Sequence, residues 1–312
     1  MNWRGHFWTL GPYLRYNLLP PEVPEWQPWE TNVDDEVVGK IQLSGRLSRG
    51  FGSRTLVVVV HGLGGSATSY YALNAAAAAA RAGIDNLRLN LRGADRSGAD
   101  YYHAGLIADL DAALSSPALR AYERILLLGY SLGGNMILRY LAAAPDPRVQ
   151  AAAVVCAPID LKRSARSIDQ PRGAFYRRHV LKALKEIYRH VSLRRSVPLP
   201  LSEALRIDTI ERWDDEVIAP RHGFAGAEDY WWRTSACRVL DDIRIPTLFV
   251  ASEHDPMVLI DTVQPWLHNA QRLRRTVTSR GGHVGFPREV DLGLGLEGSV
   301  EDQILRWMLA AT

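Results

Sequence analysis

The chain has 312 residues, of which 47% are hydrophobic and 23% charged, a composition typical of one globular domain or one domain with an insertion. A net charge of +3 is too small to indicate a nucleic-acid partner, and two cysteines exclude a disulfide scaffold and a zinc ribbon. The first ten residues lack the apolar core and cleavage site of a secretory signal. No apolar run reaches the ~18 residues of a membrane span, so we expect a cytoplasmic protein.

Aromatic residues are concentrated at the start of the chain: Trp3, Phe7, Trp8, Tyr13 and Tyr16. We expect this segment to pack on the domain. Peripheral contact with a membrane surface is the alternative.

From residue 56 onward, short apolar runs alternate with stretches long enough for helices. The runs fit strands that are buried on both faces of a parallel sheet. They lie at residues 56–60, 86–90, 124–128, 150–156, 247–251 and 273–278. Helices are expected at residues 68–82, 103–114, 132–144, 262–270 and 299–311. This alternation predicts a doubly wound α/β sheet, with residues 36–43 as an antiparallel edge strand.

One long stretch interrupts the alternation. Between residues 159 and 245 no clear buried strand occurs, and the sequence favours helices joined by proline-containing loops. That is too long for a plain connection. We therefore expect a single domain over residues 1–312 with an inserted helical cap at residues 160–240.

The segment GYSLG at residues 129–133 directly follows a predicted strand and precedes a predicted helix. A strand that turns sharply into a helix exposes the central serine at the carboxyl edge of the sheet. The helix N-terminus points its N–H groups at the place where negative charge develops. We therefore predict that Ser131 is a nucleophile.

A serine hydroxyl needs a base to take its proton. Of nine histidines, His283 alone lies in a glycine-rich loop between the last predicted strand and the last helix, so we predict that it is the base. An acid is expected between the two, after a late strand. Residues 252–256, Ser-Glu-His-Asp-Pro, offer Asp255 and Glu253 there, of which we favour Asp255; Asp160 is the alternative.

Two backbone N–H groups are needed to bind the oxyanion of an acyl-transfer intermediate. Leu132 follows the nucleophile and supplies one. The other is expected from the loop His-Gly-Leu-Gly-Gly-Ser at residues 61–66, with Leu63 as the best candidate. This loop matches neither of the common glycine-rich nucleotide-binding patterns, so we expect no nucleotide, and the chemistry requires no cofactor or metal.

The predicted cap is strongly basic. Residues 162–195 hold eleven Lys or Arg against two acidic residues. We interpret these charges first as a solvated helical face. Attraction to anionic lipid surfaces or acidic substrates is the alternative. Four aromatic side chains are candidates for a substrate pocket, with ordinary core packing as the alternative: Phe224, Tyr230, Trp231 and Trp232.

Several blocks together make the chain resemble the YheT-like branch of the α/β-hydrolases. The blocks are residues 5–6 with 9–10, 61–66, 90–93, 102–105 with Asp109, 129–135, and 219–224 followed by 228–231. The resemblance implies esterase activity with Ser131, Asp255 and His283 as a catalytic triad. Two departures are His254, where the family usually has aspartate, and Ala94, where it often has cysteine. Neither changes the three implied residues.

Three functions are therefore considered. The first is hydrolysis of small-molecule or lipid carboxylic esters through an acyl-enzyme on Ser131. The second is acyl transfer to an alcohol or thiol by the same residues. The third, a non-catalytic binding protein on the same fold, is disfavoured by the complete set of three residues. The oligomeric state does not follow from the sequence.

Overall fold

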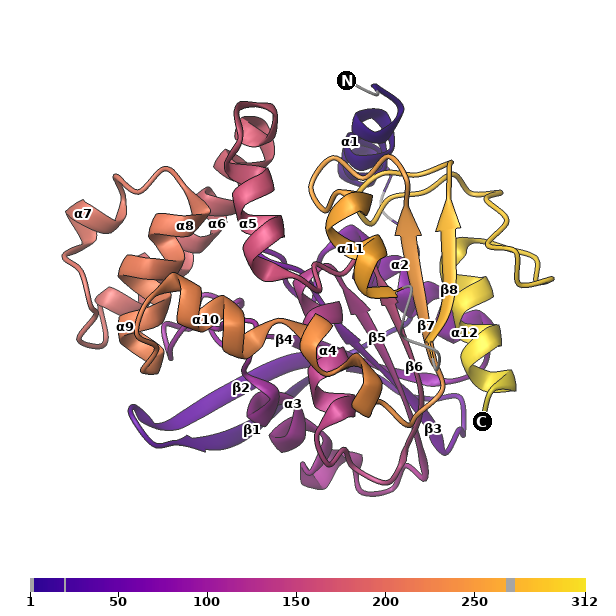
Figure 1. The fold of residues 1–312 in the computed structure, drawn as a ribbon. Coiled ribbons are helices and arrows are strands. Elements are labelled where there is room, and N and C mark those ends of the chain that lie inside the picture. Colours follow the sequence, from indigo (N-terminus) through magenta and orange to yellow (C-terminus); the bar gives the residue numbers. More distant parts are fainter. Residues whose placement is uncertain (1–2, 20, 268–272) are drawn as a thin grey trace.

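The computed structural model describes residues 3–19, 21–267 and 273–312 (Figure 1). Eight strands form one sheet in the order β1-β2-β4-β3-β5-β6-β7-β8. The strands β3 to β8 run parallel to one another, whereas β1 and β2 form an antiparallel hairpin and β2 is antiparallel to β4. The strands are β1 (Gln27–Asp35), β2 (Gly39–Ser48), β3 (Thr55–Val60), β4 (Asp85–Asn90), β5 (Arg124–Tyr130), β6 (Val149–Val155), β7 (Thr247–Ser252) and β8 (Leu273–Thr278).

Helices cover both faces of this sheet. They are α1 (Trp3–Leu18), α2 (Tyr70–Arg81), α3 (Ile107–Leu114), α4 (Leu132–Ala142), α5 (Leu161–Asp169), α6 (Ala174–Ser192), α7 (Leu201–Ala204), α8 (Ile210–Trp213), α9 (Ala219–His222), α10 (Ala227–Thr234), α11 (Ile260–Leu267) and α12 (Val300–Ala310). The shorter turns are η1 (Pro117–Leu119), η2 (Pro171–Gly173), η3 (Asp214–Ile218), η4 (Ala236–Arg238) and η5 (Leu240–Asp242), of which η3 is a π-helix. The mostly parallel, doubly wound architecture predicted from the sequence is confirmed.

The alternation of side chains along the central strands divides the core into two layers. Val57 and Val59 of β3 belong to the cluster that includes α2 and α12, whereas Val58 and Val60 belong to the cluster that includes α4. Successive side chains of a strand point to opposite faces, so a strand covered on both sides must be apolar at every position. This is why β3 has the sequence TLVVVV.

The edge of the sheet differs from the sequence prediction. Strand β2 begins at Gly39, later than the predicted residues 36–43, and it lies between β1 and β4. The unpredicted strand β1 forms the edge beside it. Only Trp29 is fully buried in β1, so the strand lacks the apolar alternation that would have revealed it. Helix α11 begins earlier than predicted, at Ile260, and residues 268–270 of that prediction lie outside the described residues.

Helices α5 to α10 all lie between β6 and β7, and we call them the inserted helices. Figure 1 shows them gathered at the left of the sheet, with α12 at the right and α1 at the top. Across the described ranges no helix is both long and apolar enough to cross a membrane. The cytoplasmic location stays a prediction.

Candidate active site

Ser131 lies at the sharp turn between β5 and α4. Its φ of 51° and ψ of −123° are strained for a residue with a side chain, and such strain is typical of a nucleophile held at a strand-to-helix turn. The turn also brings α4 close to β3, because a Cβ on Gly133 would lie 2.5 Å from the Val60 carbonyl oxygen. A larger residue at Gly133 would push the helix off the sheet and move Ser131 with it.

Three predicted side chains lie in one hydrogen-bonded row. His283 Nε2 is 3.0 Å from Ser131 Oγ, and His283 Nδ1 is 2.8 Å from Asp255 Oδ2. Both His283 and Asp255 are buried. Asp255 accepts a hydrogen bond from the Nδ1–H group of His283, which leaves His283 Nε2 to accept the hydrogen bond from the Ser131 hydroxyl. This arrangement suits transfer of the serine proton to the imidazole.

The loop after β7 fixes the orientation of Asp255. Its second oxygen, Oδ1, accepts hydrogen bonds from the backbone N–H groups of Met257 and Val258, at 2.8 and 2.9 Å. The alternative acid, Asp160, caps helix α5 instead, where it accepts from Arg163 N, and its other oxygen accepts from Trp266 Nε1. Glu253 is exposed. Of the three acidic candidates, the structure brings Asp255 to His283.

The loop at residues 61–66 packs directly against the nucleophile. A Cβ on Gly62 would lie 2.8 Å from Ser131 Cβ, so only glycine permits this approach. Tyrosine hydroxyls accept from the N–H groups on either side of Leu63, those of Gly62 and Gly64. Among the described residues, the Leu63 N–H has no such acceptor. Leu63 and Leu132 both line the cavity that Ser131 faces.

The His61 side chain connects this loop to the backbone that follows β4. Its Nδ1 lies 2.7 Å from the Gly62 carbonyl oxygen, and its Nε2 accepts from Leu91 N at 3.1 Å. One ring nitrogen donates and the other accepts, so the ring is neutral. Burial lowers the pKa of His61 to about 4, in agreement with that state. His61 thus ties the end of β3 to the end of β4.

Helix α1 contacts the histidine loop, which the sequence did not predict. The His283 N–H donates to Thr9 Oγ1 at 2.8 Å, and Thr9 Oγ1 donates to the Gly5 carbonyl oxygen. His6 Nδ1 lies 2.7 Å from the Tyr176 hydroxyl, and the two rings stack. Helix α1 therefore joins the His283 loop to the inserted helix α6.

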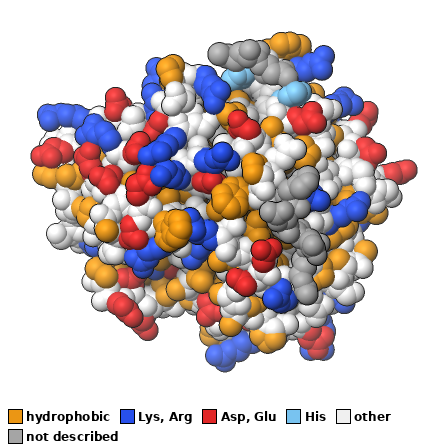
Figure 2. Space-filling view, viewed as in Figure 1, with side chains coloured by type: hydrophobic (Ala, Val, Ile, Leu, Met, Phe, Trp, Pro, Cys, Tyr) orange, Lys and Arg blue, Asp and Glu red, His pale blue; other side chains and the backbone are white. Residues whose placement is uncertain are grey.

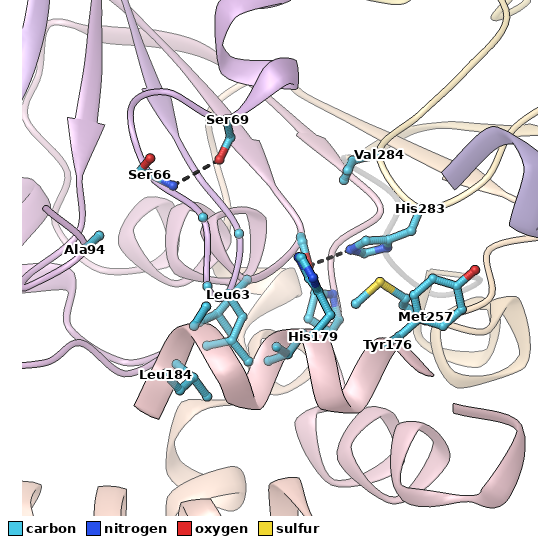
Figure 3. A pocket seen from close by; sticks show the side chains of 18 of the residues that line it. Leu63, Ser66, Ser69, Ala94, Tyr176, His179, Leu184, Met257, His283 and Val284 are labelled. Carbon is cyan, nitrogen blue, oxygen red and sulfur yellow. Dashed lines mark hydrogen bonds between the residues drawn. The ribbon is translucent and has the colours of Figure 1, made fainter. Parts of the chain in front are cut away.

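A cavity of about 970 Å³ lies above Ser131. Its walls come from α1, the loop after β3, the His283 loop and the inserted helices. Figure 3 shows Tyr176, His179 and Leu184 extending from α6 toward Leu63 and His283. Most of the wall is aliphatic or aromatic, so the cavity is suited to an apolar group next to the nucleophile.

The four aromatic candidates separate into two pairs. Tyr230 and Trp231 line the cavity. Phe224 contacts the rings of His103 and Tyr230 instead, and Trp232 is 61% exposed. Among the described residues that form the cavity wall, neither of this second pair is included.

Asp214, at the start of the π-helix η3, adds a carboxyl group to the cavity wall that the sequence did not reveal. It accepts from Trp231 Nε1 at 2.7 Å, and burial raises the pKa of Asp214 to about 7. Nothing in the spacing of Asp214 marks it as a site residue.

Cys156 lies beside the three hydrogen-bonded side chains. Its Sγ, an Asp255 oxygen and a His283 nitrogen lie within 4.8 Å of one another, close enough to consider a metal ion. Metal binding requires a thiolate and a free imidazole nitrogen. Burial raises the pKa of the Cys156 thiol well above its usual value, and both His283 nitrogens have partners. The arrangement therefore favours proton transfer over metal binding.

A second cluster of buried polar side chains is centred on Arg92, just after β4, and we call it the Arg92 cluster. The guanidinium binds Asp109 with two hydrogen bonds, at 2.6 and 3.1 Å, and also contacts Asp35 and Asp100. Arg221 of the inserted helices binds the other oxygen of Asp100. The cluster therefore joins β1, the loop after β4, α3 and α9.

The chain is similar to several known proteins. Residues 55–289 match the family described as alpha/beta hydrolase fold. The chain is 31% identical to the putative esterase YheT of Escherichia coli K12 over 74% of this chain and 70% of that protein.

Two further relatives come from Saccharomyces cerevisiae. One is a monoacylglycerol lipase, 25% identical over 75% of this chain and 55% of its own length. The other is medium-chain fatty acid ethyl ester synthase/esterase 2, 27% identical over 74% of this chain and 58% of its own length. The chain thus spans little more than half of either yeast protein.

Proposed function

The chain belongs to the α/β-hydrolase family, in the branch of the putative esterase YheT, and is an ester hydrolase; from that premise we propose that Ser131, His283 and Asp255 are its catalytic residues. The observation that supports this most directly is the pair of hydrogen bonds, 3.0 and 2.8 Å, that joins the three side chains below an apolar cavity.

The chemistry follows from that row. His283 Nε2 takes the Ser131 proton as Oγ bonds to the ester carbonyl carbon, and Asp255 stabilises the imidazolium. The N–H groups of Leu63 and Leu132 bind the oxyanion. The alcohol leaves with the proton from His283, and the acyl group stays on Oγ. Water, activated by His283, then releases the carboxylic acid.

The substrate that we propose is a lipid ester with one acyl chain, such as a monoacylglycerol. A volume of about 970 Å³ is at the upper end of the range for small-molecule sites, and the wall near Ser131 is largely apolar. The similarity to a monoacylglycerol lipase supports the same class. We further propose that residues 160–240 act as the cap of a single domain, because α5, α6 and α10 supply part of that wall.

Substitution of the nucleophile tests the proposal. Ser131→Ala should reduce turnover of p-nitrophenyl esters by about 10⁴-fold or more and abolish labelling by a fluorophosphonate probe. Ser192→Ala, on α6 away from the cavity, is the matched control and should keep both. Labelling that persists in Ser131→Ala would disprove the assignment of the nucleophile.

Acyl transfer to an alcohol is the second candidate. It is favoured by the similarity to a protein named as both synthase and esterase of fatty acid ethyl esters. The acyl-enzyme is common to both reactions, so only the acceptor differs. Turnover of a monoacylglycerol with added ethanol should give an ethyl ester in addition to the free acid if transfer occurs.

A further inference from the structure

Helix α1 has two opposite faces with different surroundings. One face packs on the rest of the protein through Gly5, Thr9 and Tyr16. Thr9 accepts from the His283 N–H, and Tyr16 donates to the Thr68 carbonyl oxygen. Gly5 lies against the His254 backbone. Residues of an α-helix are about 100° apart, so these three fall on one side. The opposite side faces away from the protein.

That outer side is apolar. Its side chains recur at intervals of four, three, four and four residues and fall within an arc of about 80°. They are Trp3, Phe7, Leu10, Leu14 and Leu18. Four of them are well exposed, at 69% for Trp3, 54% for Phe7, 59% for Leu14 and 80% for Leu18. We call these five residues the α1 stripe. A row of exposed apolar side chains of this size is typical of a surface that binds another protein or a membrane.

The charged side chains of helix α1 itself are positive. Helix α1 contains no acidic residue, and Arg4 and Arg15 flank the stripe on one side. On the neighbouring helix α6, Phe175, Arg178 and Lys182 are exposed as well. Where Figure 1 places α1, the upper edge of the molecule in Figure 2 carries hydrophobic, basic and histidine side chains, and acidic side chains lie just below them. Aromatic and leucine side chains bordered by arginine and lysine suit an anionic lipid surface.

The stripe is also continuous with the cavity. Leu10 belongs to the stripe and lines the cavity, as do Tyr13 of α1 and Phe175 and Lys182 of α6. The hydrogen bond between His6 and Tyr176 holds α1 and α6 together at this place. A molecule that rests on the stripe is therefore beside the walls that lead to Ser131.

We propose that the α1 stripe and the exposed cations of α6 form a docking surface for an anionic lipid bilayer, from which the ester enters the cavity. The proposal rests on the proposed function for the identity of the ester but not for the binding itself. A protein held at this surface has its cavity next to the leaflet that contains the substrate.

The experiment measures co-sedimentation with phosphatidylcholine vesicles, with and without phosphatidylglycerol. The Phe7→Ser/Leu14→Ser variant should bind the anionic vesicles about tenfold more weakly or worse, because two apolar side chains no longer insert. Leu193→Ser is the matched control, since Leu193 is an exposed leucine (77%) outside the stripe, and it should bind normally. Wild-type protein should prefer the anionic vesicles and lose that preference at high salt.

A short, water-soluble ester separates this proposal from the proposed function. Phe7→Ser/Leu14→Ser should hydrolyse it at the wild-type rate, which also shows that the variant is folded, and should lose activity on a monoacylglycerol within the vesicles. Ser131→Ala should still bind vesicles. If the double variant is unfolded, Arg15→Glu/Arg178→Glu serves instead and should lose the preference for anionic vesicles.

Three outcomes would overturn the proposal. The first is wild-type protein that does not bind anionic vesicles, and the second is a stripe variant that binds them as well as wild type. The third is a wild-type dimer that Phe7→Ser/Leu14→Ser converts to a monomer, as seen by light scattering, because the stripe would then be an interface between two copies of the chain.

Discussion

Two buried polar groups in this molecule look alike in composition and differ in what they are able to do. In the Arg92 cluster, arginines bind three carboxylates, and across the described residues none of its members lines the cavity. In the row of Ser131, His283 and Asp255, the last atom is a hydroxyl that faces the cavity from a strained backbone position. Burial and hydrogen bonding alone therefore do not identify a reactive site. A chain of hydrogen bonds that ends at an accessible nucleophile does.

The largest effect is expected from a substitution in the row of Ser131, His283 and Asp255 that removes a charge and hardly changes the shape of the side chain. Asp255→Asn should lower kcat for ester hydrolysis by about 10⁴-fold, because the amide would hold His283 in the wrong tautomer. The two backbone donors at Met257 and Val258 still have an oxygen to bind, so the fold should persist. Steady-state kinetics with a soluble ester and a thermal melt measure both effects.

Asp160→Asn is the matched control for that substitution. Asp160 caps α5, and asparagine caps helices equally well. Asparagine loses only the exposed hydrogen bond from Trp266 Nε1, so the melting temperature should fall slightly at most and kcat should not change. A loss of activity in Asp160→Asn together with normal activity in Asp255→Asn would reassign the acid.

In the Arg92 cluster the expected effect is on stability. Arg92→Met removes the cation and leaves Asp109 buried without its partner, whereas Asp100 keeps Arg221. The loss should lower the free energy of unfolding by about 3–5 kcal/mol. Urea denaturation measures the loss. At a temperature where the variant is folded, kcat should stay within a few-fold of wild type. A folded variant with a thousandfold lower kcat would contradict the distinction between the two groups.

The catalytic candidates could be predicted because each follows a strand. Ser131, Asp255 and His283 come after β5, β7 and β8, and the carboxyl ends of parallel strands meet at one edge of a sheet. The motif at residues 90–93 and Asp109 was also recognisable from the sequence, but its purpose was not. Only the contacts show that these residues hold the fold together.

The features that the sequence could not predict depend on the direction in which a side chain points and on contacts between residues far apart in the chain. Trp231 and Trp232 are neighbours of the same type, yet a rotation of about 100° between them puts one in the cavity wall and the other in solvent. The strand β1 was missed because only Trp29 on its inward face is fully buried, so its sequence lacks the apolar alternation of a half-buried strand. The contact between Thr9 and His283 joins residues 274 positions apart, and no local pattern reports it.

Thr9 provides the finest test of the comparison, because its contact is structural in form but touches the proposed base. Thr9→Val keeps the shape of the side chain and removes the acceptor of the His283 N–H. The loop that carries His283 should then be held less firmly, and kcat should fall about tenfold with little change in KM. Thr9→Ser keeps the hydroxyl and should restore kcat. If Thr9→Val lowers only the melting temperature and leaves kcat unchanged, then α1 supports the fold alone, and the boundary between the two kinds of buried polar group lies at His283 itself.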